Sequence, residues 1–342
     1  MALAPPTRLA WRLLGYLVLI PAAALPYASP AQGGAQAAVA IEQARHATVG
    51  ILSETPAERG SGYQGRLSIR GTGVHLRDGF IVTARHAVER DQGSKGPLPS
   101  SILVLTDDLA ELPAHLVGGS AYLDIVLYRL GDAHRHQLRA GVPFAADEAA
   151  TGDDVFTVGY PLGWGPAIAY GRVGNPNTFL PTAETRLLQI DLSACSGNSG
   201  GGLFNAAGEL VGVMHAIIRT DQGQGEQRCS RFAFGVPAIL AQRIVAALME
   251  GKQPGFSRLG IQMTQVRVVT TWRIAAGEVS GPAKDGGVQK GDVLLAINGV
   301  AITDAAHLKN YLMEQTAPGQ TATLRVLRGD QELQLSITLG AA

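Results

Sequence analysis

Short strand-like runs recur at even spacing between residues 48 and 236, and they constrain the fold of this chain most. Each run is apolar or alternates apolar with polar residues, and glycine, aspartate, asparagine or proline separates it from the next. The runs are 48–52, 73–76, 80–83, 102–105, 125–128, 154–158 and 209–213. Evenly spaced short strands with turn signals are typical of a sandwich or a closed barrel. No helices alternate with these strands, which disfavours a parallel nucleotide-binding sheet.

Length and composition limit the class of protein. The 342 residues suit about two domains. Hydrophobic residues make up 46% of the chain and charged residues 16%, so a sizeable core can form. The formal net charge is zero and there is no long basic run, whereas a nucleic-acid binder needs a clustered cationic face. We therefore expect a globular protein that does not bind nucleic acid.

The N-terminus is typical of an export signal. Arg8 and Arg12 precede an apolar stretch at 13–25, and small residues follow up to Ala31. We expect a signal peptide over 1–31 and an exported protein, periplasmic or extracellular. The alternative is an uncleaved segment that tethers the protein to the membrane. Prolines interrupt this segment, and its apolar part is shorter than the roughly 20 residues of a spanning helix.

The chain has two cysteines, Cys195 and Cys229. In an oxidising compartment we expect them to form one disulfide, worth roughly 3–4 kcal/mol in the chain-entropy model. Two free buried thiols are the alternative. Because Cys195 lies four residues before Ser199, a bridge there would brace the segment around that serine.

Residues 196–201, SGNSGG, contain the strongest chemical signal. A serine between glycines can expose its hydroxyl while backbone N–H groups converge where a tetrahedral oxyanion would form. Such a hydroxyl needs a base within hydrogen-bonding reach, and His86, at the start of a loop after strand 80–83, suits that role. Asp124 precedes an apolar strand and would orient the imidazole. Asp107 and Asp108, which lie in a polar turn, are the rival carboxylates.

The order His86, Asp124, Ser199 is that of double β-barrel serine proteases, and it differs from the orders in subtilisin and the α/β-hydrolases. Over nearly the whole mature chain the sequence resembles the HtrA/DegP-type serine proteases. The matching motifs are 71–74, 86–88, 124–127, the Gly-x-Pro-x-Gly turn at 159–163, 197–201 and 234–237. The resemblance implies a mainly β fold: a chymotrypsin-like double six-stranded β-barrel at 47–250 and an α+β PDZ domain at 251–342. Before them we expect an N-terminal linker at 32–46, polar at first and with a short helical segment near residues 42–45.

The C-terminal part carries its own signals. A helix is expected from Pro237 to about Met249, and a strand at 291–299 ends in an Asn-Gly turn. Thr303 or Asp304 can cap a further helix, and 321–327 with 332–339 alternate like a closing hairpin. Residues 258–261 resemble the carboxylate-binding loop of PDZ domains. The resemblance implies that Leu259, Gly260 and Ile261 offer N–H groups to a peptide C-terminus; a plain α/β cap without a ligand is the alternative.

The resemblance also implies residue roles. The catalytic residues would be His86, Asp124 and Ser199, and the backbone N–H groups of Gly197 and Ser199 would line the oxyanion hole. Ser193 would lie near the floor of the specificity pocket, while His215, Ala216 and Ile217 would lie near the strand that pairs with substrate. The alternative is that these four are ordinary strand residues. With no aspartate at the floor, we expect a preference for small aliphatic rather than basic residues. We expect no metal and no other cofactor, since the ligand-type pair His134 and His136 stands alone.

The functional prediction is an exported endopeptidase that cleaves unfolded or misfolded proteins through an acyl-enzyme, with a PDZ domain that binds peptide C-termini. Two alternatives remain: a proteolytically idle chaperone or scaffold, and a processing protease with one native target. Departures from the family pattern include Arg85 and Ala87 beside the histidine and a short segment in place of its long regulatory loop. The aromatic residues that join the family's trimers are not evident after Ala31, so the sequence leaves a homo-oligomer open without indicating a trimer.

Overall fold

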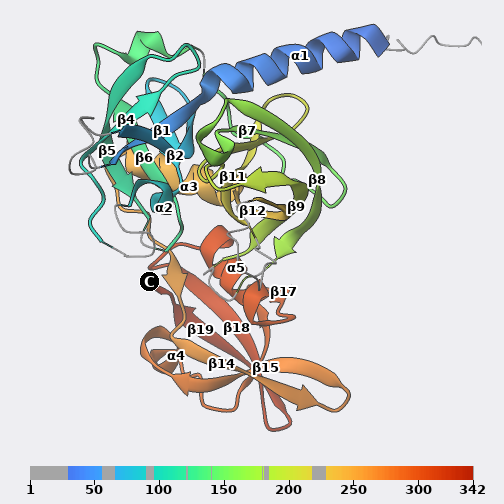
Figure 1. The fold of residues 1–342 in the computed structure, drawn as a ribbon. Coiled ribbons are helices and arrows are strands. Elements are labelled where there is room, and N and C mark those ends of the chain that lie inside the picture. The colour runs from blue at the N-terminus through green and yellow to red at the C-terminus, as the bar shows by residue number, and fades with distance from the viewer. Residues whose placement is uncertain are drawn as a thin grey trace, which may run out of the picture.

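The computed structural model describes residues 30–55, 66–89, 96–120, 122–139, 141–178, 180, 185–217 and 229–341. Most of the expected signal peptide, residues 1–29, lies outside these ranges. Within them, no helix has the length and apolar character needed to cross a membrane. Figure 1 shows two barrels side by side, with a C-terminal α+β region against one end of the pair.

The first barrel is closed and has six antiparallel strands. They are ordered β1-β2-β3-β6-β5-β4, with bounds Thr48–Thr55, Arg66–His75, Phe80–Thr83, Ser101–Leu105, Glu111–Gly119 and Val126–Leu130 for β1 to β6. Alternate side chains of these strands point inward. Val49, Ile81, Val104 and Tyr128 are among those that fill its core.

The second barrel is also closed, in the order β10-β11-β12-β9-β8-β7. Its strands are β7 to β12: Asp154–Gly159, Ala167–Thr178, Leu187–Cys195, Gly202–Phe204, Leu210–Ile217 and Cys229–Pro237. Cys195 and Cys229 are paired residues of β9 and β12 and form a disulfide. The predicted double six-stranded barrel and the predicted disulfide are both confirmed.

Helix α3, Ala238–Met249, lies between the barrels in Figure 1. Leu240, Ile244 and Leu248 belong to a buried cluster with residues of both barrels. The helix begins one residue later than predicted, because Pro237 still pairs with Gly212 in the sheet and acts as the N-cap.

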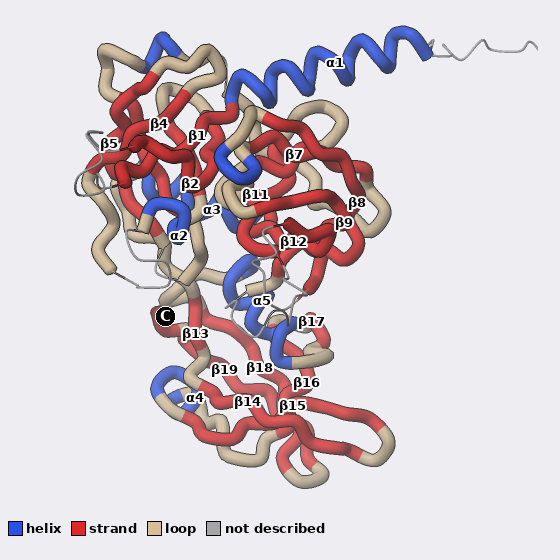
Figure 2. The backbone as a smooth tube through the Cα atoms, viewed as in Figure 1, coloured by secondary structure: helices blue, strands red, loops and turns tan. Residues whose placement is uncertain are grey.

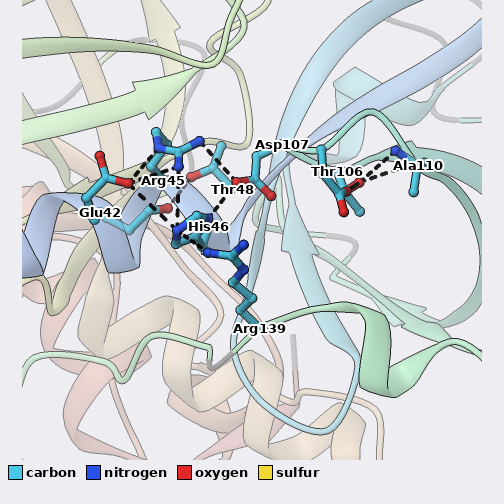
Figure 3. Close-up of polar contacts among 10 residues, drawn as sticks. Glu42, Arg45, His46, Thr48, Thr106, Asp107, Ala110 and Arg139 are labelled. Carbon is cyan, nitrogen blue, oxygen red and sulfur yellow. Dashed lines mark hydrogen bonds and ion pairs between the residues drawn. The ribbon is translucent and has the colours of Figure 1, made fainter.

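Helix α1, Pro30–Ala47, replaces the linker expected at 32–46. The helical segment expected near residues 42–45 is part of this helix. The linker expected before it was wrong, because that stretch is rich in alanine and glutamine, which favour helix. The helix projects from the barrels, as Figures 1 and 2 show. Its C-terminal half is anchored: Ala40, Ala44 and Ala47 are buried, and His46 contacts Asp107 (Figure 3).

The C-terminal region is a sheet in the order β14-β15-β16-β18-β19 with two short helices. The bounds of β13 to β20 are Ser257–Arg258, Ile261–Val268, Thr271–Val279, Val293–Ile297, Val300–Ala301, Thr321–Arg328, Gln331–Thr338 and Gly340–Ala341; α4 is Gly281–Asp285 and α5 is Ala305–Gln315. Asp304 caps α5 through the N–H of His307, at 2.8 Å. The predicted strand, Asn-Gly turn, capped helix and closing hairpin are confirmed.

Charged side chains fasten α5 to the second barrel. The Arg186 guanidinium, only 5% exposed, donates to Glu314 of α5 at 2.5 Å and to Glu148, in the segment before β7, at 2.5 Å. The backbone N–H of Arg186 donates to the Asn310 side chain of α5 at 3.1 Å. Arg243 of α3 donates to the Met313 and Thr316 carbonyls. The two regions therefore meet through α5.

Candidate active site

His86 lies on α2, Arg85–Val88, a single helical turn that follows β3. Its ring Nδ1 is 2.5 Å from Oδ2 of Asp124, and its backbone N–H donates to Oδ1 at 2.9 Å. Asp107 instead contacts His46, at 2.5 Å. Of the rival carboxylates, the structure therefore brings Asp124, and not Asp107, to His86.

The electrostatics of this pair favour a charged carboxylate. Burial alone would raise the pKa of Asp124, whose side chain is 14% exposed, but hydrogen bonds from His215 and His86 hold it well below its usual range. Burial works against the cation of His86, yet the Asp124 hydrogen bond and charge, with a contribution from Glu89, raise its pKa above the usual value. Because an ionised carboxylate only accepts, His86 carries its proton on Nδ1, which leaves Nε2 as the free base.

The Ser199 segment of the second barrel lies against the first barrel. The N–H of Thr72 in β2 donates to the Ser199 carbonyl at 2.8 Å. A β-carbon at Gly71 would lie 2.6 Å from Cβ of Ala87 and 3.2 Å from the same Ser199 carbonyl. Gly71 therefore packs directly between Ser199 and Ala87 of α2. Among the described residues no hydrogen bond joins Ser199 Oγ to His86. In a protein without substrate such a contact is commonly long and tightens on binding.

Carbonyl contacts orient the peptide groups around Ser199. The Ser196 carbonyl accepts from Leu162 N at 2.7 Å, and the Asn198 carbonyl accepts from Gly201 N at 2.9 Å. In a trans peptide the N–H points opposite to the C=O, so the N–H groups of Gly197 and Ser199 face away from these partners. Neither N–H has a protein acceptor within the described ranges. Their predicted role as oxyanion donors stays a prediction.

Glycine is required at position 197. Its φ is +103°, and a β-carbon there would lie 2.2 Å from the Tyr160 carbonyl. Its own carbonyl accepts from Thr72 Oγ1 at 2.6 Å. Thr72 of the first barrel thus holds two carbonyls of this segment, those of Gly197 and Ser199.

His215 makes a contact that the sequence did not predict. Its Nδ1 lies 2.8 Å from Oδ2 of Asp124, the oxygen that His86 also contacts. The signal was an ionisable residue in an otherwise apolar run, LVGVMHAI at 210–217. Of the other specificity candidates, Ala216 and Ile217 follow His215 on β11, where Ala216 pairs with Phe234 and Ile217 packs against the second-barrel core, and Ser193 is exposed on β9. Their role in specificity stays a prediction.

His86, Asp124 and His215 form the one metal-ligand-type cluster within the described ranges, with ligand atoms inside 4.8 Å of one another. The separations of 2.5 and 2.8 Å are shorter than the roughly 3.3 Å between two donors on a tetrahedral zinc ion. These are hydrogen-bond distances, so the cluster is a hydrogen-bonded set. The expectation of no metal cofactor stays a prediction.

A second candidate site lies in the C-terminal region. Leu259, Gly260 and Ile261 line a groove of about 960 Å³, together with Leu308 and Leu312 of α5. The carbonyls of Leu259 and Gly260 accept from Ala283 N and Ser280 N, both at 2.8 Å, so the N–H groups of Gly260 and Ile261 face the other way. This arrangement suits a terminal carboxylate.

Two closed six-stranded barrels, with a histidine–aspartate pair on one and a glycine-flanked serine on the other, define the class of trypsin-type serine proteases. Residues 71–213 match the trypsin-like peptidase domain, and residues 257–339 match the PDZ domain. A probable periplasmic serine endoprotease, DegP-like, from Rhizobium meliloti (strain 1021) is 29% identical over 297 residues, 82% of this chain and 56% of the relative. One with the same description from Bartonella henselae is 30% identical over 281 residues, 79% of this chain and 52% of the relative.

Solved structures agree on the fold. The HtrA-type protease AlgW with a tripeptide has a TM-score of 0.71 at 25% identity, covering 90% of this chain and 97% of that one. The serine endoprotease from Yersinia pestis has a TM-score of 0.63 at 24% identity, with 90% and 98% coverage. The chain belongs to the HtrA/DegP-like family of trypsin-type serine proteases with a PDZ domain. It spans about half the length of the curated relatives it matches.

Proposed function

We propose that this protein is an exported serine endopeptidase that cleaves unfolded or misfolded polypeptides through an acyl-enzyme. The carrying observation is the juxtaposition across the two barrels. The His86 ring is fixed by Asp124 at 2.5 Å, and the Ser199 segment is fixed beside it by Thr72 at 2.8 Å. Polypeptide substrates, an export location and the domain limits 47–250 and 251–342 belong to the same proposal.

In this mechanism Ser199 Oγ attacks the scissile carbonyl while its proton passes to Nε2 of His86. Asp124 stabilises the resulting imidazolium without taking the proton. The N–H groups of Gly197 and Ser199 bind the oxyanion, each worth about 10²–10³ in rate. His86 then protonates the leaving amine, and water hydrolyses the acyl-enzyme by the reverse sequence of proton transfers.

A fluorophosphonate probe tests this function, because it reacts with an activated serine and not with a passive one. We expect the wild type to be labelled at Ser199, and we expect Ser199→Ala and His86→Ala to abolish labelling. Ser196→Ala, in the same segment, is the matched control and should label normally. A folded wild type that stays unlabelled, with and without added C-terminal peptides, would refute the proposed activity.

The groove lined by Leu259, Gly260 and Ile261 supports binding of peptide C-termini. Carboxyl-terminal peptides and their amidated counterparts separate this role from a plain structural cap. We expect the free carboxylate to bind and the amide to bind at least tenfold more weakly, since the amide lacks the charge that the N–H groups recognise. Equal affinities would contradict it.

An idle scaffold is the second candidate, since no hydrogen bond joins Ser199 Oγ to His86 among the described residues. It predicts peptide binding without probe labelling. A processing protease with one native target would label but would leave casein intact. Casein turnover by a labelled wild type favours the general endopeptidase.

A further inference from the structure

His215 is bonded to the carboxylate that orients the proposed base. Three N–H groups reach the Asp124 carboxylate: the His86 backbone N–H at 2.9 Å on Oδ1, and the rings of His86 and His215 at 2.5 and 2.8 Å on Oδ2. Since the carboxylate is ionised, both rings donate from Nδ1. The two imidazoles therefore share one acceptor atom.

The backbone of β11 aims His215 at this site. The pairing of β11 with β12 slips between Met214 and Ala216, so His215 lies at a β-bulge. A bulge redirects the side chain that it carries, and bulges recur next to active sites. The preceding residue, Met214, is bonded through both backbone groups to the Ser199 segment: Gly200 N donates to its carbonyl and its N–H donates to Gly201, each at 2.8 Å.

We infer that His215 is a positioning residue of the proposed active site, which shares Asp124 with His86 and thereby sets the pH at which His86 becomes a free base. The inference rests on the proposed function, and nothing in the family assignment gives His215 this role. It adds a role to the expectation that His215 lies near the strand that pairs with substrate.

The sharing has a definite direction. A carboxylate oxygen that already accepts a hydrogen bond from His215 stabilises the cation of His86 less. The second donor therefore keeps the pKa of His86 lower than it would be without His215. A positive charge on His215 would act the same way, because the two ring centroids are 6.1 Å apart. The other charged group that acts on His86 is Glu89, which is itself paired with Arg85 at 2.7 Å.

Two substitutions separate the parts of this role. His215→Ala removes the donor, whereas His215→Asn keeps an N–H that can reach Asp124 and cannot ionise. We expect the alanine variant to lose about tenfold in kcat with little change in KM, and the acid limb of its pH–rate profile to move up by about half a pH unit or more. The asparagine variant should recover most of kcat, and the acid limb of its pH–rate profile should lie between those of the wild type and the alanine variant. A residue that merely borders substrate would change KM across a peptide series and leave the acid limb in place.

A second measurement does not depend on activity. In a Ser199→Ala background with isotope-labelled histidine, NMR titration follows His86 directly. We expect its midpoint to rise when His215→Ala is added and to rise less with His215→Asn, while His307→Ala on α5 leaves it unchanged. A midpoint and acid limb that stay at wild-type values in the alanine variant, or an asparagine variant shifted as far as alanine, overturn the role of His215. Failure of probe labelling in the wild type would instead count against the proposed function alone.

Discussion

Two aspartate–histidine pairs in this molecule have nearly the same geometry at Nδ1 of the imidazole. They differ in what lies against the other ring nitrogen, Nε2. Nδ1 of His86 lies 2.5 Å from Asp124, and Nδ1 of His46 lies 2.5 Å from Asp107. Their carboxylates are 14% and 13% exposed. The Nε2 of His46 accepts from Arg139 at 2.6 Å (Figure 3), whereas that of His86 has no acceptor or donor against it among the described residues.

The comparison teaches that an aspartate on Nδ1 does not by itself make a histidine a base. His46 is closed on both nitrogens: Asp107 takes one, Arg139 the other, and Arg45 also donates to Asp107 at 3.0 Å. That arrangement fixes the last turn of α1 to the first barrel. The His86 pair has Nε2 open among the described residues and the Ser199 segment alongside, which is what the proposed proton transfer needs once substrate closes the remaining gap.

Substituting the two carboxylates should give the largest difference in kcat between the two pairs. Asp124→Asn should lower kcat about 10⁴-fold, because the amide favours the wrong tautomer of His86. Asp107→Asn should leave kcat within about twofold. Peptide hydrolysis and probe labelling measure both. Equal losses in the two variants would show that the contacts are not functionally distinct.

The serine segment provides the next largest effect. Thr72→Val removes the hydroxyl that holds the Gly197 carbonyl, so the oxyanion N–H groups lose an anchor and kcat should fall about tenfold to a hundredfold. Thr157→Val is the matched control, since this equally buried hydroxyl donates to Gly202 at 2.7 Å, outside the segment. Similar rates for the two variants would argue against the anchoring role.

A smaller effect tests the closed pair. Arg139→Ala should reduce stability to urea by at most about 1 kcal/mol, because its contact with His46 is exposed. It should leave kcat unchanged and should increase modification of His46 by diethyl pyrocarbonate, since Nε2 becomes accessible. Unaltered modification would mean that Arg139 does not close the ring in solution.

The smallest effect concerns pH. The pKa of His86 is raised above its usual value, so activity should fall as pH drops through a midpoint above about 6.5, where the base becomes protonated. Glu89 contributes to that raised pKa, so Glu89→Gln should move the acid limb a few tenths of a pH unit lower. A shift in the upward direction would contradict this account of the site's charge.

Much of this architecture could be predicted from the sequence. The even spacing of strand runs, the order His86, Asp124, Ser199 and the pair Cys195 and Cys229 are local signals that the fold preserves. Asp124 was separable from Asp107 because it precedes a buried strand. Each of these inferences needed only residue type, spacing and flanking pattern.

What could not be predicted depends on contacts between distant segments. The bond from His215 to Asp124 joins residues 91 positions apart through a β-bulge, and a bulge leaves no fixed mark in the sequence. Thr72 anchors Gly197 across 125 positions. Only the C-terminal end of helix α1, near residues 42–45, was predicted. The polar character of residues 32–40 indicated a linker, and the helix propensity of the alanine and glutamine in that stretch was given too little weight.

The hydroxyl of Thr72 has one more consequence. The Ser199 segment is covalently part of the second barrel, yet its Gly197 and Ser199 carbonyls are bonded to the first. If the chain were cut between the barrels, each fragment would keep its own strands but neither would keep a competent centre. Reactivity would return only when the two barrel fragments reassociate. Recovery of probe labelling on mixing would therefore measure the formation of the interface between the barrels.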